Sequence, residues 1–275
     1  MSDNMKRPEN LPIAKLHPFE NNPYKVQDGE EMESLVGSIQ TQGILSPLIV
    51  RPMESTGEYE VISGHRRLYA AQKAGLETVP ALIYAFDRDA AAIVLVDSNL
   101  HREHILPSEK AFAYKLKMEA LAHRGVTCGQ VGHKSRDDIS DTDSGRTVQR
   151  YIRLTRLVPE LLQMMDEGRI AFSVGVELSY LPPQSQHDVL AAIELNDCTP
   201  SYSQACRMHR EAETLTADQI RAMLAEEKPN QREQIKLRRD EFRKYFPSNY
   251  TDQQIVRDIL RGLELLKRQR SRDAR

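Results

Sequence analysis

The sequence predicts an α+β fold, in which a small α/β N-terminal domain precedes a series of helices. Short β-branched runs alternate with helical patterns up to residue 105, and after Pro107 the apolar residues recur with helical spacing. At 275 residues the chain has room for two or three domains. We expect an α/β domain at 1–105, a helical domain at 106–200 and a helical C-terminal region at 201–275.

The first 105 residues carry signals for three helices and three strands. Met32, Leu35, Val36 and Ile39 share one helical face, and Gly43 follows them as a stop signal. Runs rich in β-branched residues predict the strands, and glycines separate them from their neighbours. The expected strands are 48–51, 59–63 and 79–84, and the other expected helices are 65–74 and 89–100.

The helices expected in the rest of the chain are placed by their capping residues. Ser108 is expected to cap a helix that ends at Arg124, and Ser144 a helix from Gly145 to Val158. Further helices are expected at 160–167, 173–181 and 183–195, and capping boxes mark two later starts, Thr216 with Gln219 and Thr251 with Gln254. The last helix carries one apolar stripe, formed by Ile255, Ile259, Leu263 and Leu266.

Composition and charge limit the class of protein. No apolar run approaches the roughly 18 residues that span a bilayer, so we expect a cytoplasmic protein without a membrane partner. Cys128, Cys198 and Cys206 fit neither a zinc site nor a disulfide framework. The net charge is only −2, but residues 201–275 hold 17 Lys and Arg against 12 Asp and Glu, which fits a polyanionic partner. The charge run at 267–275 indicates first a solvated helix end and second a nonspecific DNA contact.

Two polar clusters of the N-terminal domain could bind a phosphorylated ligand. Gly64-His65-Arg66-Arg67 stands where a strand runs into a helix, so that backbone N–H groups and arginines could meet an anion. A helix that begins with two solvated arginines explains the same spacing equally well. Asn99 and Arg102 could serve a metal ion and a phosphate, but by themselves they indicate only a polar helix end.

The helix expected after Ser144 has the character of a DNA-reading helix. Residues 144–159 contain four arginines and no acidic residue. Polar side chains at its start can meet base edges, and arginines can meet phosphates. Residues 137–140 would belong to the first helix of a helix-turn-helix, although their acidic side chains would oppose a phosphate backbone. A solvated amphipathic helix is therefore the alternative. We expect Val148, Ile152 and Leu157 to face a core, and Arg146, Thr147, Gln149 and Arg150 to point outward.

Several segments resemble, in the same order, the ParB-like partition proteins. The N-terminal match consists of Asn22-Pro23-Tyr24, Ser38 to Arg51, Gly64 to Ala71 and Gly75 to Ala81. It continues through Asn99 to Glu103 and Leu106 to Ala111 into the helix-turn-helix region, to about Leu181. The resemblance covers roughly two-thirds of the chain. Each motif alone is a weak signal, whereas the ordered series is specific.

The resemblance implies a fold, a nucleotide ligand and macromolecular partners. The N-terminal domain would be similar to sulfiredoxin and would bind CTP with Mg²⁺, the central domain would bind double-stranded DNA, and the C-terminal region would form a homodimer. Such a protein acts in partition of a plasmid, mobile element or chromosome, is associated with the nucleoid, and can have a ParA-like ATPase as a further partner. Carried over by position, the nucleotide-binding residues are Gln42, Gly43, Ile44, Gly64, His65, Arg66, Arg67, Asn99 and Arg102, with Asn99 also on the metal side. The DNA-binding residues are Ser144, Gly145, Arg146, Thr147, Gln149, Arg150 and Arg153.

Some positions depart from the family pattern. His65 and Ser98 stand where the family has two glutamates that it associates with the metal and with hydrolysis, so we expect CTP binding with little hydrolysis. Lys25-Val26-Gln27 replaces the family's Gln-Pro-Arg and adds to this expectation. In the DNA-binding region, Asp141-Thr142-Asp143 replaces a turn glycine, and Ser173 to Val176 replaces Gly-His-Ala-Arg. The family's usual DNA site is therefore not expected to transfer.

Other functions fit the same scaffold. A transcriptional regulator could keep the DNA-binding helices without nucleotide switching. Sulfiredoxin activity is disfavoured because Gly64 stands where its cysteine would be. A small-molecule kinase could use His65 as a general base, but the helical residues 106–275 argue against it.

Overall fold

The structure is a computed structural model of the chain. It describes residues 7–53, 56–102, 104–124, 140, 143–226, 246, 254–255, 257–259 and 261–262. Its residues fall into two units, Met1–Glu226 and Glu227–Arg275. The first unit contains the α/β part and the helices up to residue 226, and it carries both candidate sites.

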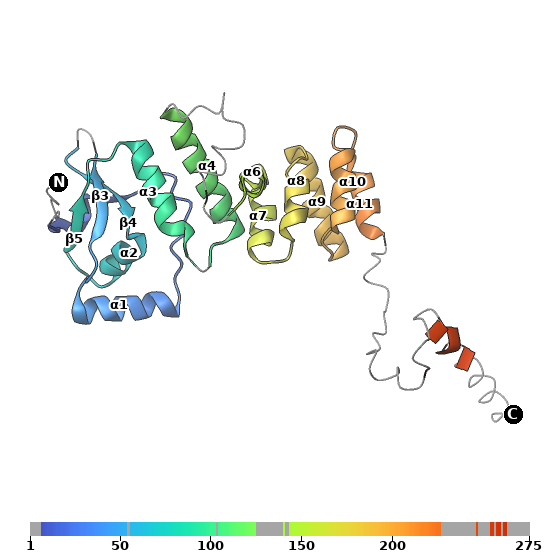
Figure 1. Ribbon diagram of the computed structural model, residues 1–275, viewed down its shortest axis with the longest axis horizontal. Helices are drawn as coiled ribbons and strands as arrows, with labels where there is room; N and C mark the ends of the chain where they lie inside the picture. Colours follow the sequence, from blue (N-terminus) through green and yellow to red (C-terminus); the bar gives the residue numbers. More distant parts are fainter. Residues whose placement is uncertain are drawn as a thin grey trace. The chain divides into compact units, whose positions relative to one another are not determined.

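A mixed five-stranded sheet lies at the centre of the N-terminal part (Figure 1). Its strands are β1 (Glu9–Pro12), β2 (Leu16–Pro18), β3 (Leu48–Pro52), β4 (Tyr59–Ser63) and β5 (Thr78–Ile83). Their order across the sheet is β1-β5-β3-β4-β2. The pairs β1–β5 and β3–β4 are antiparallel, and β3–β5 and β2–β4 are parallel. The three predicted strands are confirmed to within a residue at each end, whereas β1 and β2 were missed because they are short and end in proline.

Helices cover both faces of this sheet. On one face, Leu68 and Ala71 of α2 (His65–Lys73) pack against Val61 of β4, and α1 (Glu30–Gln42) packs on α2. On the other face, Leu95 of α3 (Arg88–Leu100) packs against Ile62. Val61 and Ile62 are consecutive in one strand, so their side chains point to opposite faces. The predicted ends of these helices are confirmed, including Gly43 as the C-cap of α1.

The helical part follows as α4 (Pro107–His123), α6 (Gly145–Leu154), α7 (Pro159–Asp166), α8 (Phe172–Leu178), α9 (Pro183–Asn196), α10 (Tyr202–Arg210) and α11 (Ala217–Ala225). These helices share a core that runs from Ala111 to Leu224. This core passes residue 200, so α10 and α11 pack with α8 and α9 inside the first unit. The α+β fold class is confirmed, and the three functional domains stay predictions.

Helix α4 joins the α/β part to the helical part. Ala113 packs against Tyr24 and Val96 of the N-terminal part, and Tyr114, the next residue, packs against Val148 of α6. Asp97 at the end of α3 pairs with Lys117 of α4 at 2.6 Å. The predicted boundary at residue 105 therefore lies just before a helix that is buried on two sides.

Several helix ends differ from the prediction. Leu106, not Ser108, is the N-cap of α4, and Ser108 is buried with its hydroxyl 2.5 Å from an Asp166 carboxylate oxygen. Helix α6 ends at Leu154 instead of Val158, because residues 155–157 bond three residues back in a turn and the Val158 N–H donates to Gln186. Helix α10 was not predicted, although it begins with a capping box at Ser201 and Gln204.

The last two predicted helix starts have different outcomes. The capping box at Thr216 and Gln219 is confirmed at the start of α11. Thr251, Leu263 and Leu266 lie outside the described residues, while Ile255 and Ile259 are helical. No helix in the described part of the chain is long and apolar enough to cross a membrane.

Candidate functional site

The start of α6 is fixed by its cap. The Ser144 side-chain oxygen accepts a hydrogen bond from the Thr147 N–H at 3.3 Å, which satisfies one of the free donors of the first turn. Gly145 is buried, and Val148 is completely buried against Tyr114 of α4. The opposite side of the helix, with Arg146 and Gln149, is exposed.

Four arginines line a pocket of about 670 Å³ on the exposed side of this helix. Arg146, Gln149, Arg150 and Arg153 have the i, i+3, i+4, i+7 spacing of one helical face. Helices α4, α8 and α10 complete the pocket. Its lining consists of Lys115, Met118, Glu119, Arg146, Gln149, Arg150, Ile152, Arg153, Thr155, Arg156, Val176, Glu177, Tyr180 and His209.

Aromatic rings, not carboxylates, hold two of these arginines. The Arg150 guanidinium carbon lies 4.9 Å from the Phe172 ring centroid, and the Arg153 guanidinium carbon lies 3.9 Å from the Tyr180 ring centroid. Burial, helped by the nearby charge of Arg156, lowers the pKa of Arg153 below its usual range. Within the described residues, none of the four arginines forms an ion pair with a carboxylate. The pocket therefore presents positive charge that suits phosphate oxygens.

Asp143, the acidic residue before the Ser144 cap, has partners within the protein and does not oppose the positive charge of the pocket. Asp143 is 2.5 Å from Lys110 Nζ, and it accepts a hydrogen bond from the Tyr114 hydroxyl at 2.6 Å. Burial favours the protonated form of Asp143, but these two hydrogen bonds outweigh it and hold the pKa of the carboxyl below its usual range. Residues 137–139 and 141–142 lie outside the described residues, so the first helix of the predicted helix-turn-helix and its turn stay predictions.

One core prediction for α6 is confirmed only in part. Ile152 is partly buried, packing against the cluster of Tyr114 and Val148 while also lining the pocket, whereas Leu154 is completely buried. Helix α6 packs on α4 through Val148 and on the α7–α9 core through Leu154, so two of its sides are covered. Val148 and Leu157 are buried as predicted.

The second candidate site lies where β4 runs into α2. Gly64 is the N-cap of α2 and has φ of +105°, a left-handed value that favours glycine. A Cβ atom there would lie 3.0 Å from Leu48 Cγ, a tight contact that would require the Leu48 side chain to shift. Gly64 has no side chain to cap the first turn of α2, so the N–H groups of this turn could meet an anion.

The two arginines of this turn already have protein partners. Arg67 Nη1 donates to the carbonyl oxygens of Ser46 and Pro47, the latter at 2.9 Å, and burial lowers the pKa of its guanidinium. Arg66 pairs with Glu31 of α1 at 3.0 Å. The Arg67 contacts tie the loop after α1 to the start of α2. Of the predicted residues, Gln42 ends α1, and Gly43 and Ile44 lie in this loop. Gln42 and Gly43 are exposed, and Ile44 packs against the sheet.

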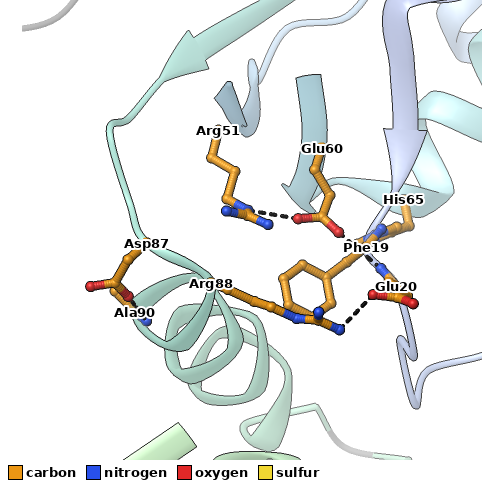
Figure 2. Close-up of polar contacts among 8 residues, drawn as sticks. All are labelled: Phe19, Glu20, Arg51, Glu60, His65, Asp87, Arg88 and Ala90. Carbon is orange, nitrogen blue, oxygen red and sulfur yellow. Dashed lines mark hydrogen bonds and ion pairs between the residues drawn. The ribbon is translucent and has the colours of Figure 1, made fainter. Parts of the chain in front are cut away.

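His65 holds the chain segment after β2 (Figure 2). Its Nε2 accepts a hydrogen bond from the Phe19 N–H at 3.4 Å. Burial, together with the charge of Arg102, lowers the pKa of His65 from 6.5 to about 4. The ring is therefore neutral near pH 7 and its Nε2 lone pair is already used. This contact disfavours His65 as the general base of the kinase alternative.

Sequence reasoning missed a buried ion pair beside His65 (Figure 2). Glu60 of β4 is 5% exposed, lies 2.6 Å from Arg51 Nε and accepts the Glu20 N–H at 3.0 Å. His65 and Glu60 thus accept hydrogen bonds from the N–H groups of two consecutive residues, Phe19 and Glu20. The available signal was an acidic residue between apolar residues of a buried strand.

Asn99, the predicted metal ligand, uses its amide nitrogen within its own helix. Asn99 is 6% exposed, and its amide nitrogen donates to the Leu95 carbonyl at 2.7 Å and lies 3.3 Å from Ser98 Oγ. Among the described residues, no three His, Cys, Asp or Glu side chains gather as a metal site would require. The residues present do not fit a protein-held Mg²⁺, which prefers carboxylate oxygens. Arg102 lies over the Tyr24 ring, with its guanidinium carbon 5.5 Å from the centroid.

Known proteins are similar to this chain over its N-terminal and central parts. Residues 2–100 match the family model described as the ParB N-terminal domain. The chromosome-partitioning protein Spo0J of Thermus thermophilus is 36% identical over 177 residues, which cover 64% of this chain and 61% of that protein. The chain therefore spans less than two thirds of this relative.

Solved structures of Caulobacter crescentus ParB, C-terminally truncated, are also similar. One is a complex with the centromeric parS site, with 23% identity, a TM-score of 0.43, and coverage of 78% of this chain and 98% of that chain. The other is a complex with CTP-gamma-S, with 28% identity, a TM-score of 0.33, and coverage of 62% and 91%. The α/β part therefore matches the ParB N-terminal domain, and the chain is similar to a chromosome-partitioning protein.

Proposed function

We propose that this protein binds specific sites on double-stranded DNA through α6 and acts in DNA partition. The observation that carries the proposal is the row of arginines on the exposed face of α6, which have no carboxylate partner among the described residues. DNA supplies the missing anions as phosphates. The similarity to a chromosome-partitioning protein supports the partition role. A ParA-like ATPase as a further partner follows from the family resemblance alone.

The side chains of α6 divide into readers and phosphate ligands. Gln149 is exposed and can form paired hydrogen bonds with adenine, while Arg146 can do so with guanine. Arg150 and Arg153 lean on aromatic rings along the pocket wall and suit phosphates. Ser144, Gly145 and Thr147 form the first turn, where backbone N–H groups can meet a phosphate.

Sequencing the DNA recovered with the protein from cells tests this proposal. A discrete enriched sequence, with or without spreading around it, is the expected result. Uniform recovery across the genome would contradict sequence-specific binding. Recovery at promoters alone, with changed transcription and normal inheritance of the replicon, would support the transcriptional regulator instead.

We further propose that the turn at Gly64 binds CTP with little hydrolysis. Support comes from the free N–H groups of the first turn of α2 and from Arg102, which has no carboxylate partner among the described residues. CTP itself follows from the family resemblance. Arg67 would have to exchange its carbonyl partners for phosphate, and no step is assigned to a metal because the residues do not fit one. Neutral His65, bonded to the Phe19 N–H, has no lone pair at Nε2 to orient water.

Calorimetry with each of the four nucleoside triphosphates, followed by phosphate-release assays with and without the recovered DNA, tests the nucleotide proposal. We expect heat with CTP and little phosphate release. Absence of heat with all four would contradict binding, and rapid DNA-stimulated CTP turnover would contradict the role given to His65.

We also propose that the C-terminal unit, Glu227–Arg275, forms the homodimer. The apolar stripe that begins with Ile255 and Ile259 supports this, and two-fold symmetry suits paired DNA half-sites. Since α11 belongs to the core of the first unit, truncation after Glu226 leaves that core intact. Sedimentation of the truncated protein as a monomer is expected, and a dimer would contradict the proposal.

A further inference from the structure

We infer that the DNA interface extends from α6 onto α8 and α10, where Arg153, Tyr180 and His209 form a subsite for a DNA phosphodiester. We call this column of side chains the Arg153 stack. The inference rests on the proposed DNA binding by α6 and assigns residues outside the helix-turn-helix to it. These residues would position the protein on the duplex without reading its sequence.

The Arg153 stack joins three separate elements. The Tyr180 ring, in the turn after α8, has the Arg153 guanidinium 3.9 Å from its centroid. The His209 imidazole of α10 stacks on the same ring, with 4.0 Å between the ring centroids and 13° between the planes. All three side chains line the pocket that contains Arg146 and Arg150. The stack is therefore a direct continuation of the arginine face of α6.

The guanidinium of Arg153 lacks an anionic partner. Its Nε atom is buried and has no hydrogen-bond partner among the described residues. A buried charged donor without an acceptor has lost water without replacement, which is why burial lowers the pKa of this group. An anion in the pocket would restore the lost stabilisation. The ring of Tyr180 meanwhile restricts the guanidinium to one place, so that less rotamer entropy is lost on binding.

Each acidic residue of the pocket already has a basic partner. Glu177 Oε2 lies 2.6 Å from His209 Nδ1, and Glu119 lies 4.0 Å from Lys115 Nζ. The four arginines remain in excess. Glu177 is nevertheless the carboxylate nearest the Arg153 stack by its contact with His209, so its charge would oppose a phosphate there.

The chemistry of the pocket favours a phosphodiester backbone over other occupants. Guanidinium groups match phosphate oxygens, and the pocket lies on the same face as Gln149, the proposed base reader. Tyr180 is 43% exposed, so the stack can be reached from solvent. A free nucleotide or an acidic peptide would also meet these charges, and the experiment separates them from DNA.

Glu177→Gln tests the subsite, because the subsite predicts stronger DNA binding, whereas a variant that damages the fold binds DNA more weakly. Glu177→Gln keeps the shape and a hydrogen bond to His209 but removes the negative charge. We expect it to raise affinity for both the recovered DNA site and a scrambled duplex about two- to fivefold, and to steepen the log–log salt dependence by up to about 0.9. A purely structural role for Glu177 predicts unchanged or weaker binding.

Changing Tyr180 tests the support of Arg153. Tyr180→Ala should weaken binding to both duplexes by about three- to tenfold, as expected for a lost cation–π contact, whereas Tyr180→Phe keeps the ring and should bind like wild type. Asp218→Asn removes one negative charge from α11, outside the pocket lining, and is the net-charge control for Glu177→Gln. Unchanged melting temperatures show that the variants are folded.

The outcomes separate this inference from the proposed function. If wild type binds DNA and Arg150→Ala weakens it, but Glu177→Gln does not strengthen binding or Tyr180→Ala equals wild type, the subsite is wrong and the α6 proposal stands. If wild type does not bind duplex DNA, both are wrong. A further outcome is that micromolar free CTP displaces DNA from wild type but not from the Tyr180→Ala variant. This result would assign the pocket to a nucleotide and overturn the subsite.

Discussion

Two helices of this protein begin with the same kind of signal and use it differently. Helix α2 starts at Gly64 and α6 at Ser144, and each presents arginines in its first turns. In α2, Arg66 pairs with Glu31 and Arg67 with two carbonyl oxygens. In α6 the arginines rest on aromatic rings and lack carboxylate partners within the described chain. The charge at the start of α6 is thus free for a ligand, whereas the arginines of α2 would first have to give up protein partners.

The largest expected effect is on stability, at the buried ion pair of the α/β part. Glu60→Ala leaves Arg51 without its partner and the Glu20 N–H without an acceptor. We expect a loss of about 3 kcal/mol in the free energy of unfolding, measured by urea denaturation. Glu58→Ala, at an exposed neighbour in the same hairpin, is the control and should change stability by less than about 0.5 kcal/mol. Equal losses of stability for Glu60→Ala and Glu58→Ala would show that the Arg51–Glu60 ion pair is not stabilising.

The next effect is the pH dependence caused by His65. Its pKa is lowered from 6.5 to about 4 in the folded protein, so folding favours the neutral ring. The contribution of the neutral His65 ring to the free energy of unfolding is fully present above pH 6.5. It is lost as the pH falls from about 6.5 to about 4, and the loss is about 2 kcal/mol or more. Urea denaturation across this range should show a steeper loss for wild type than for His65→Asn. Parallel curves would mean that His65 is not buried in its neutral form.

Replacing one arginine of each helix start by alanine sharpens the comparison between α2 and α6. Arg67→Ala should lower stability by about 2 kcal/mol, because two carbonyl acceptors lose a charged donor, and should leave DNA affinity unchanged. Arg150→Ala should leave stability nearly unchanged and weaken DNA binding. Thermal melting and fluorescence anisotropy on the same preparations measure both quantities. The comparison fails if the two variants behave alike.

The smallest effect is at the cap of α6. Ser144→Ala removes the acceptor for the Thr147 N–H and should cost about 1 kcal/mol of stability. Ser144→Asp can still accept that bond and should recover the loss, but its charge should weaken DNA binding. Recovery of both properties would argue against a phosphate near this turn.

The sequence predicted what depends on near neighbours. The helix stop at Gly43 and the cap at Ser144 are local signals, and both are confirmed. Strands β1 and β2 depend on pairing with β5 and β4, which lie far along the chain, and no local pattern marks them. The capping box at Ser201 was a local signal that was overlooked.

The candidate sites depended on contacts that the sequence does not show. The partners of Arg67 lie 20 and 21 residues earlier in the chain, and the partner of His65 lies 46 residues earlier. Tyr180 and His209 join the α6 pocket only because α8 and α10 pack together. A pattern of residue types could therefore predict which helix starts carry several arginines, but not which of these arginines have partners within the protein.

The central claim is that α6 reads DNA, and the ratio of affinities for the recovered site and a scrambled duplex tests it most directly. Gln149→Ala should lower affinity for the recovered site by about 1 to 3 kcal/mol and leave the scrambled duplex unaffected, which reduces the ratio. Arg150→Ala should weaken both and leave the ratio nearly unchanged. If both variants bind both duplexes like wild type, α6 is not the reading helix.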